Sequence, residues 1–233
     1  MTGSSTALDP LWVSFEGLEG VGKTRLTAQL AHRLGPTCCL LTELTDASGE
    51  QVPAQVITAL AAAGDPFLRT GYPLTETFAL LALKVREHEV VAQMTAPPAL
   101  VLEDRGIDSV AIYQAAILLG ADASDDAVWS LAQDLFSTAD GWCPLPDLTV
   151  LLLDDLEVCG QRWTEREGIP LTTDQRHLVE RADRLYQRLA QHQPVRYRVI
   201  RRTGRAEADV LDELEATVNC AAIQKRSSHA EAS

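Results

Sequence analysis

The sequence predicts an α/β fold in which a five-stranded parallel sheet lies between two layers of helices. Short apolar runs alternate with longer segments of helical periodicity from one end of the chain to the other. The apolar runs are continuous rather than alternating, which is typical of strands buried on both faces. A length of 233 residues is enough for one domain of this class.

The order of elements follows from turn residues and periodicity. Strands are expected over residues 11–16, 38–43, 99–104, 148–153 and 197–200. Helices are expected over residues 23–34, 51–63, 76–94, 109–119, 125–137, 156–165, 174–191 and 206–220. We interpret residues 11–223 as a single domain, with a flexible leader over 1–10 and a flexible, solvated tail over 224–233.

Composition excludes several classes of protein. The net charge of -13 would repel nucleic acids and anionic membranes, so an anionic ligand requires a local basic site. No apolar run reaches the roughly 18 to 20 residues that cross a bilayer, and the N-terminus lacks the features of a secretory signal, so a cytoplasmic protein is expected. The five cysteines have no CxxC spacing, which argues against a zinc site or a disulfide framework.

Basic residues are unevenly distributed along the chain. The stretch from Gly160 to Arg205 contains eleven arginines and only five acidic residues. We therefore expect this region to face anions. Only three lysines are present, at positions 23, 84 and 225, so the position of Lys23 is informative.

A glycine-rich motif, GLEGVGKT, follows the first expected strand and opens into a helix. This GxxxxGK[ST] spacing in a strand, loop and helix context predicts a phosphate-binding loop. Its backbone N–H groups would hold the phosphates of ATP, Lys23 would reach the terminal phosphates and Thr24 would bind Mg²⁺. The residues expected to bind phosphate are Gly17, Gly20, Val21, Gly22, Lys23 and Thr24.

A second polar signal ends the strand over residues 99–104. Asp104 and Arg105 emerge at the carboxyl edge of the sheet, where open α/β folds bind ligands. Asp104 is expected to hold Mg²⁺ or its water ligands, and Arg105 is expected to bind an anionic group of a second substrate.

A third signal is the basic segment RWTEREG, followed by the turn GIPLTT. Arg162 and Arg166 are four residues apart on one helical face. A hinged basic segment could cover a transferring phosphoryl group and exclude water, so we expect a helical lid over about residues 160–175. We therefore expect a three-layer α/β/α phosphate-loop fold with a helical lid, an arrangement suited to a kinase.

These signals, in this order, resemble the thymidylate kinase family of phosphate-loop nucleoside monophosphate kinases from about Leu11 to Tyr186. The stretch DRGIDSVAIYQ is similar to the family's DRYxxSxxAYQ pattern, with Gly106 in place of the aromatic residue and Ile112 in place of alanine. PDLTVLLLD resembles the strand that leads to the lid, and ERADRLY resembles a later ERxxxxY helix.

The resemblance implies ATP- and Mg²⁺-dependent phosphorylation of a nucleoside monophosphate, dTMP in this family, and a homodimer that pairs through the helix from Glu76 or the one from Asp125. It implies that Arg105 holds the acceptor phosphate. The loop has Gly20 where some members have arginine, so the catalytic arginines would be Arg162 and Arg166. The other residues implied to line the acceptor site are Glu19, Ser109, Tyr113 and Gln114.

Two departures concern the acceptor. The family's REPGGT-like run is replaced by LLTELTDASG, with Glu43 about where arginine is expected. An aromatic residue followed four positions later by arginine usually frames the base, whereas Phe78 is followed at that spacing by Ala82, with Lys84 and Arg86 displaced. Glu43, Phe78 and Arg86 are therefore acceptor-site candidates in a remodelled pocket.

The alternative function is a nucleoside or other small-alcohol kinase, in which Glu43 would accept the hydroxyl proton as a general base. The sequence argues against a GTP-binding switch protein, because such proteins read guanine with an NKxD motif and the only asparagine here is Asn219. A nucleotide-binding protein without catalysis would tolerate the loss of Arg162 and Arg166.

Overall fold

A computed structural model describes residues 9–46 and 51–232. Its sheet has five parallel strands in the order β2-β3-β1-β4-β5. The strands are β1 (Leu11–Glu16), β2 (Cys38–Leu41), β3 (Leu100–Asp104), β4 (Leu148–Leu153) and β5 (Tyr197–Arg201). The predicted fold class and all five predicted strands are confirmed.

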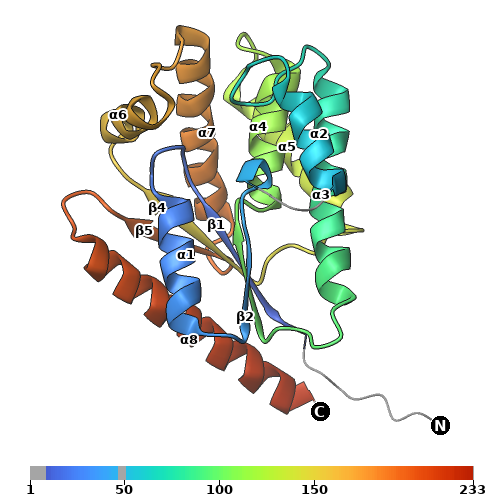
Figure 1. Ribbon diagram of the computed structural model, residues 1–233, viewed down its shortest axis with the longest axis vertical. Coiled ribbons are helices and arrows are strands. Elements are labelled where there is room, and N and C mark those ends of the chain that lie inside the picture. The colour runs from blue at the N-terminus through green and yellow to red at the C-terminus, as the bar shows by residue number, and fades with distance from the viewer. Residues whose placement is uncertain (1–8, 47–50, 233) are drawn as a thin grey trace.

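Helices cover both faces of the sheet (Figure 1). They are α1 (Lys23–Leu34), α2 (Gln51–Ala61), α3 (Pro73–Ala92), α4 (Ile107–Leu119), α5 (Asp125–Asp140), α6 (Leu156–Glu167), α7 (Thr173–His192) and α8 (Glu207–Ala232), with a short 3₁₀ helix, η1 (Leu44–Asp46). In the described residues, no helix is both long and apolar enough to cross a membrane.

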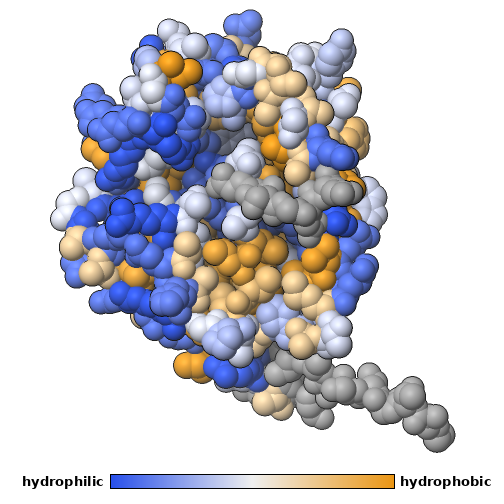
Figure 2. Space-filling view, in the orientation of Figure 1, coloured by the Kyte–Doolittle hydropathy of each residue, from blue (hydrophilic) through white to orange (hydrophobic). Residues whose placement is uncertain are grey.

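Side chains that alternate along β4 divide the core into two layers. Val150 and Leu152 pack with α1 and α8, whereas Leu151 and Leu153 pack with α3, α4, α5 and α7. All four side chains are buried, which explains the continuous apolar run in the sequence. At the sheet edge, the residues of β2 are half-buried, and an apolar surface is visible there between α1 and α3 (Figure 2).

Several element ends differ from the prediction by one to three residues, and the end of the last helix differs by more. The second strand ends at Leu41 rather than residue 43, because the chain turns into η1 directly afterwards. The last helix does not end near Cys220 but continues through the segment expected to be a flexible tail, as far as Ala232. Lys225 in this extension donates to the Pro10 carbonyl at 2.9 Å and to Asp147 at 2.7 Å, so it ties the helix to the sheet.

The order of the strands indicates where a ligand would bind. After β1 the chain turns toward β2, whereas after β3 it crosses to β4 on the other side of β1. The connections that leave the carboxyl ends of β1 and β3 therefore diverge, and a crevice at such a switch point is where ligands bind in open α/β sheets. Glu16 and Asp104 end these two neighbouring strands.

Candidate functional site

The phosphate loop, Gly17–Thr24, connects β1 to the N-terminus of α1. Three of its glycines have positive φ angles, of 135° at Gly17, 75° at Gly20 and 88° at Gly22, which lets the backbone N–H groups converge. No side chain caps the N-terminus of α1, and its first turn has no acidic residue. The first N–H groups of this helix are therefore available to an anion.

Lys23 lies within this loop, as the sequence predicts. Its side chain is buried, and Nζ donates to the carbonyl oxygens of Gly17 and Leu18 at 2.9 Å each. Burial lowers the pKa of Lys23, and the neighbouring Arg105 lowers it further. The ammonium is bound to neutral carbonyls in the loop, so an arriving phosphate would be its strongest partner.

Asp104 ends β3 beside the loop. Its carboxylate is 1 % exposed, and neither oxygen has a hydrogen-bond partner among the described residues. Burial raises the pKa of this carboxyl, while the Lys23 ammonium opposes the rise. Within residues 9–46 and 51–232, no three His, Cys, Asp or Glu side chains could form a metal site together.

These features fit Mg²⁺, which is usually held by one or two protein ligands, substrate phosphates and water. A cation or its water ligands would satisfy the two buried Asp104 oxygens. Thr24, an exposed residue in the first turn of α1, is the other expected ligand.

Arg105 follows directly and is fixed in an unusual conformation. Its φ angle is +64°, and its backbone N–H donates to the Phe15 carbonyl at 3.1 Å, which extends the sheet ladder by one residue. Its guanidinium lies between two carboxylates, with Nη2 2.7 Å from Glu19 and Nε 2.8 Å from Glu43. The side chain is thus aimed at the space between the phosphate loop and the cavity described below.

A buried polar cluster under Arg105 holds this turn. Glu16 accepts hydrogen bonds from the Gly106 N–H at 2.7 Å, from Ser14 at 2.7 Å and from Ser109 at 2.5 Å. A Cβ atom on Gly106 would lie 2.6 Å from Ser14 Oγ, so any larger residue here would force the polar side chains of the cluster to move. The cluster therefore favours glycine at the position where the family pattern has an aromatic residue.

Glu16 makes stability depend on pH. Burial raises the pKa of Glu16 from its ordinary 4.5 to about 7, and Asp108 acts in the same direction. Between these values the folded protein holds a proton that the unfolded chain releases, so the free energy of unfolding should fall as pH rises from about 4.5 to 7. We expect Glu16 to contribute about 3 kcal/mol to this loss.

Urea unfolding of the wild type and E16Q at several pH values between 4.5 and 8 measures this contribution. The pH dependence should be shallower in E16Q, whatever the absolute stability of that variant. An identical dependence in both proteins would show that Glu16 is not the titrating group.

A cavity beside Arg105 brings together most of the predicted acceptor residues. Glu19, Glu43, Arg105, Ser109, Tyr113 and Gln114 all line it. Tyr113 donates to Glu19 at 2.8 Å, and the amide of Gln114 contacts the Thr77 hydroxyl at 3.0 Å. The rings of Phe67 and Tyr113 are 5.7 Å apart and form part of the wall.

Phe78 and Arg86 do not line this cavity. Phe78 is 64 % exposed on the outer face of α3, and Arg86 is half-buried further along the same helix. Leu80 and Lys84, which also have a four-residue spacing, face the cavity instead. Of the two displaced basic residues, Lys84 rather than Arg86 lines the cavity, and Leu80 was not predicted, because apolar residues surround α3 on several sides and hide which face is buried.

Lys84 is held firmly at the cavity floor. Its Nζ lies 2.8 Å from Glu87 and 3.0 Å from Glu103, and the side chain is 1 % exposed. Burial alone would lower the pKa of Lys84, but the two carboxylates raise it, so the ammonium stays charged. It offers the cavity a fixed hydrogen-bond donor.

The two arginines expected to act from a lid, Arg162 and Arg166, have different surroundings. Arg162 Nη1 is 2.8 Å from Asp154 and donates to the Gly20 carbonyl at 3.3 Å. Arg166 is more exposed, pairs with Glu167 at 2.7 Å and stacks over the Trp163 ring at 5.0 Å.

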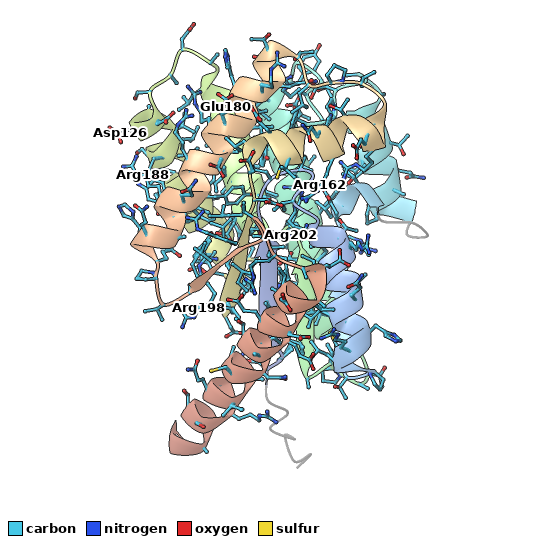
Figure 3. The ribbon with its side chains drawn as sticks, turned by 90° about the vertical axis from the view of Figure 1, so that its left-hand side faces the viewer. Asp126, Arg162, Glu180, Arg188, Arg198 and Arg202 are labelled. Carbon is cyan, nitrogen blue, oxygen red and sulfur yellow. The ribbon has the colours of Figure 1, made fainter. Side chains whose placement is uncertain are left out.

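Arginines of the basic segment that lie on α7 form ion pairs within the protein, whereas the segment was expected to face an anionic ligand. Arg181 and Arg184 on α7 pair with Asp125 at 3.1 and 2.7 Å, and Arg188 pairs with Asp126 at 2.7 Å (Figure 3). These ion pairs join α7 to the start of α5. These arginines are therefore not available to a ligand, because acidic residues from a distant part of the chain neutralise their charge.

Comparisons with known proteins agree with this geometry. The family model for thymidylate kinase matches residues 15–212. A thymidylate kinase of Thermomicrobium roseum is 34% identical over 214 residues, which cover 89% of this chain and 93% of that protein.

Two solved structures show the same fold. The thymidylate kinase of Ehrlichia chaffeensis has a TM-score of 0.61 at 22% identity and covers 91% of this chain and 99% of its own. The thymidylate kinase of Candida albicans has a TM-score of 0.64 at 18% identity, with coverages of 92% and 93%. Since the family match spans most of the sequence, the chain belongs to the thymidylate kinase family, the phosphate-loop enzymes that use ATP and Mg²⁺ to phosphorylate a nucleoside monophosphate.

Proposed function

We propose that the acceptor is dTMP and that the product is dTDP. The supporting observation is the placement of Arg105, whose guanidinium lies between the phosphate loop and the cavity. Arg105 would bind the acceptor phosphate, Gln114 and Lys84 would contact the base, and Glu19 would approach the sugar. Ser109 and Tyr113 complete the pocket.

Phosphoryl transfer to a monophosphate depends on positioning and charge stabilisation, because the acceptor oxygen is already anionic. Lys23 would hold the terminal phosphates of ATP, and Arg162 and Arg166 would close over them from the lid at about residues 160–175. Bound Mg²⁺, held by Thr24 and Asp104, would neutralise charge on the phosphates. Burial of Lys23 and Asp104 keeps water away from these groups.

An alcohol acceptor would need Glu43 as a general base. Although burial alone would raise the pKa of Glu43, Arg105 and Lys23 lower it, and the carboxylate is paired with Arg105 at 2.8 Å. A carboxylate with a lowered pKa is a weak base. These contacts favour a monophosphate acceptor over a nucleoside.

Steady-state turnover with ATP and Mg²⁺ tests the proposal. Product analysis should detect dTDP from dTMP, with thymidine converted much more slowly. Conversion of thymidine without conversion of dTMP would contradict it. E43Q adds a second comparison, since removing a negative charge near the acceptor phosphate should lower the KM for dTMP, whereas loss of a general base would abolish thymidine turnover.

We also propose a cytoplasmic homodimer that pairs through α3. Tyr72, Leu74 and Phe78, at and near the start of this helix, are 72 %, 63 % and 64 % exposed. Leu74 and Phe78 are four residues apart and share one helical face. Apolar side chains that gather on an exposed face are typical of a protein interface.

Phe78→Glu should therefore shift the protein from dimer to monomer, because a charge would be buried at the interface. Sedimentation velocity at several protein concentrations measures the change. Val195→Glu is the matched control, since Val195 is 89 % exposed after α7 and should leave assembly unchanged. A wild type that sediments as a monomer at all concentrations would contradict the proposed dimer.

A further inference from the structure

Arg202 lies at the same carboxyl edge of the sheet as the phosphate loop. It follows β5 directly, and its backbone N–H donates to the Leu153 carbonyl at 2.8 Å, so the sheet ladder fixes its position. The Arg205 N–H closes a turn onto the Arg202 carbonyl at 2.9 Å. The β5–α8 turn therefore presents this side chain from a rigid backbone.

The guanidinium of Arg202 rests on the phosphate loop. Its Nη1 donates to the Val21 carbonyl, and a methyl group built on Gly22 would collide with the same nitrogen. Gly22 is the residue immediately before α1, whose N-terminus has no side-chain cap. The side chain thus flanks the N–H groups that receive the donor phosphates.

Positive charge at this position exceeds nearby negative charge. Arg162 and Arg202 approach the loop from α6 and from the β5–α8 turn (Figure 3). Burial lowers the pKa of Arg202, and Arg162 lowers it further. Asp154 is already paired with Arg162 at 2.8 Å, and Glu207 with Arg25 at 3.0 Å. The surface over α6 and the β5–α8 turn is correspondingly hydrophilic (Figure 2).

We propose that Arg202 is a binding residue for the phosphate chain of the donor nucleotide, which it contacts from the Gly22 side of the loop while Lys23 binds the terminal phosphates. This inference rests on the donor half of the proposed function. Because Arg202 contacts the loop outside the acceptor cavity, it should act on ATP and ADP alike and leave the acceptor KM unchanged.

Calorimetric titration of ADP and of inorganic tripolyphosphate into the wild type, R202Q and R202K tests this assignment. R202Q should bind both ligands about 10- to 100-fold more weakly, as expected for loss of hydrogen bonds to a charged group, and R202K should recover part of the affinity. R201Q is the matched control, since the adjacent Arg201 is exposed and should bind both ligands as the wild type does.

The possible outcomes separate the two claims. Unchanged binding of ADP and tripolyphosphate by R202Q would overturn the assignment of Arg202 and leave the proposed function intact. Equal losses of ADP affinity and of dTMP affinity would also overturn it, since they would show a general distortion of the site. A wild type that binds no ADP would overturn both claims.

Discussion

Lys23→Met is expected to reduce kcat by about 10²- to 10³-fold, the effect of removing one fixed charge that stabilises a transition state. Methionine has a similar length and no charge, so the shape of the loop should survive. The buried ammonium now bonds to two neutral carbonyls, and its loss leaves no carboxylate of the loop unpaired. Single-turnover rates with saturating ATP and dTMP measure the chemical step.

Lys225→Met is the matched control for this substitution. Lys225 lies on α8 and contacts Pro10 and Asp147, far from the phosphate loop. The kcat of the Lys225→Met enzyme should equal that of the wild type. A Lys23→Met enzyme with unchanged kcat and a melting temperature like that of the wild type would contradict the role of the loop.

Arg105→Lys is expected to lower kcat/KM for dTMP by about 10²-fold, with an unchanged KM for ATP. Lysine keeps the charge between Glu19 and Glu43 but cannot make the two-pronged contact that a guanidinium makes with phosphate. Initial rates with each substrate varied in turn measure the two KM values. Retaining the charge also avoids leaving two carboxylates facing each other without a partner.

Arg196→Lys controls for the loss of a buried arginine. Both side chains are 11% exposed, and Arg196 pairs with Asp108 at 2.6 Å on the other side of the Glu16 cluster. This variant should be less stable but should keep both KM values. If the two variants change kcat/KM for dTMP equally, Arg105 acts through stability rather than through contact with the acceptor.

The sequence predicted those site residues whose positions depend only on the strand, turn or helix that carries them. The phosphate loop, Asp104 and Arg105 lie where strand, turn and helix signals place them, because each lies at or directly after the end of a buried strand. The conformation of Arg105 was not predictable in this way. Its positive φ angle is held by Glu16 and Ser14, which come from a different strand.

Features that depend on distant contacts were harder to predict. The exposed Phe78 and the buried Lys84 lie on one helix, and only the packing of α3 against α4 decides which of them faces the cavity. The arginine-rich region from Gly160 to Arg205 was expected to face anions, but Arg181 within it pairs with Asp125, 56 residues away. Arg202 could have been noticed from its place directly after the last strand, at the edge where ligands bind.

A crystal structure with adenosine and thymidine joined by a five-phosphate bridge tests the central claim most directly. The bridge should contact Lys23 at the donor end and the Arg105 guanidinium at the acceptor end, with thymine in the cavity beside Leu80 and Gln114. A thymidine half bound outside this cavity, or a bridge with no phosphate oxygen within hydrogen-bond distance of Arg105, would contradict it.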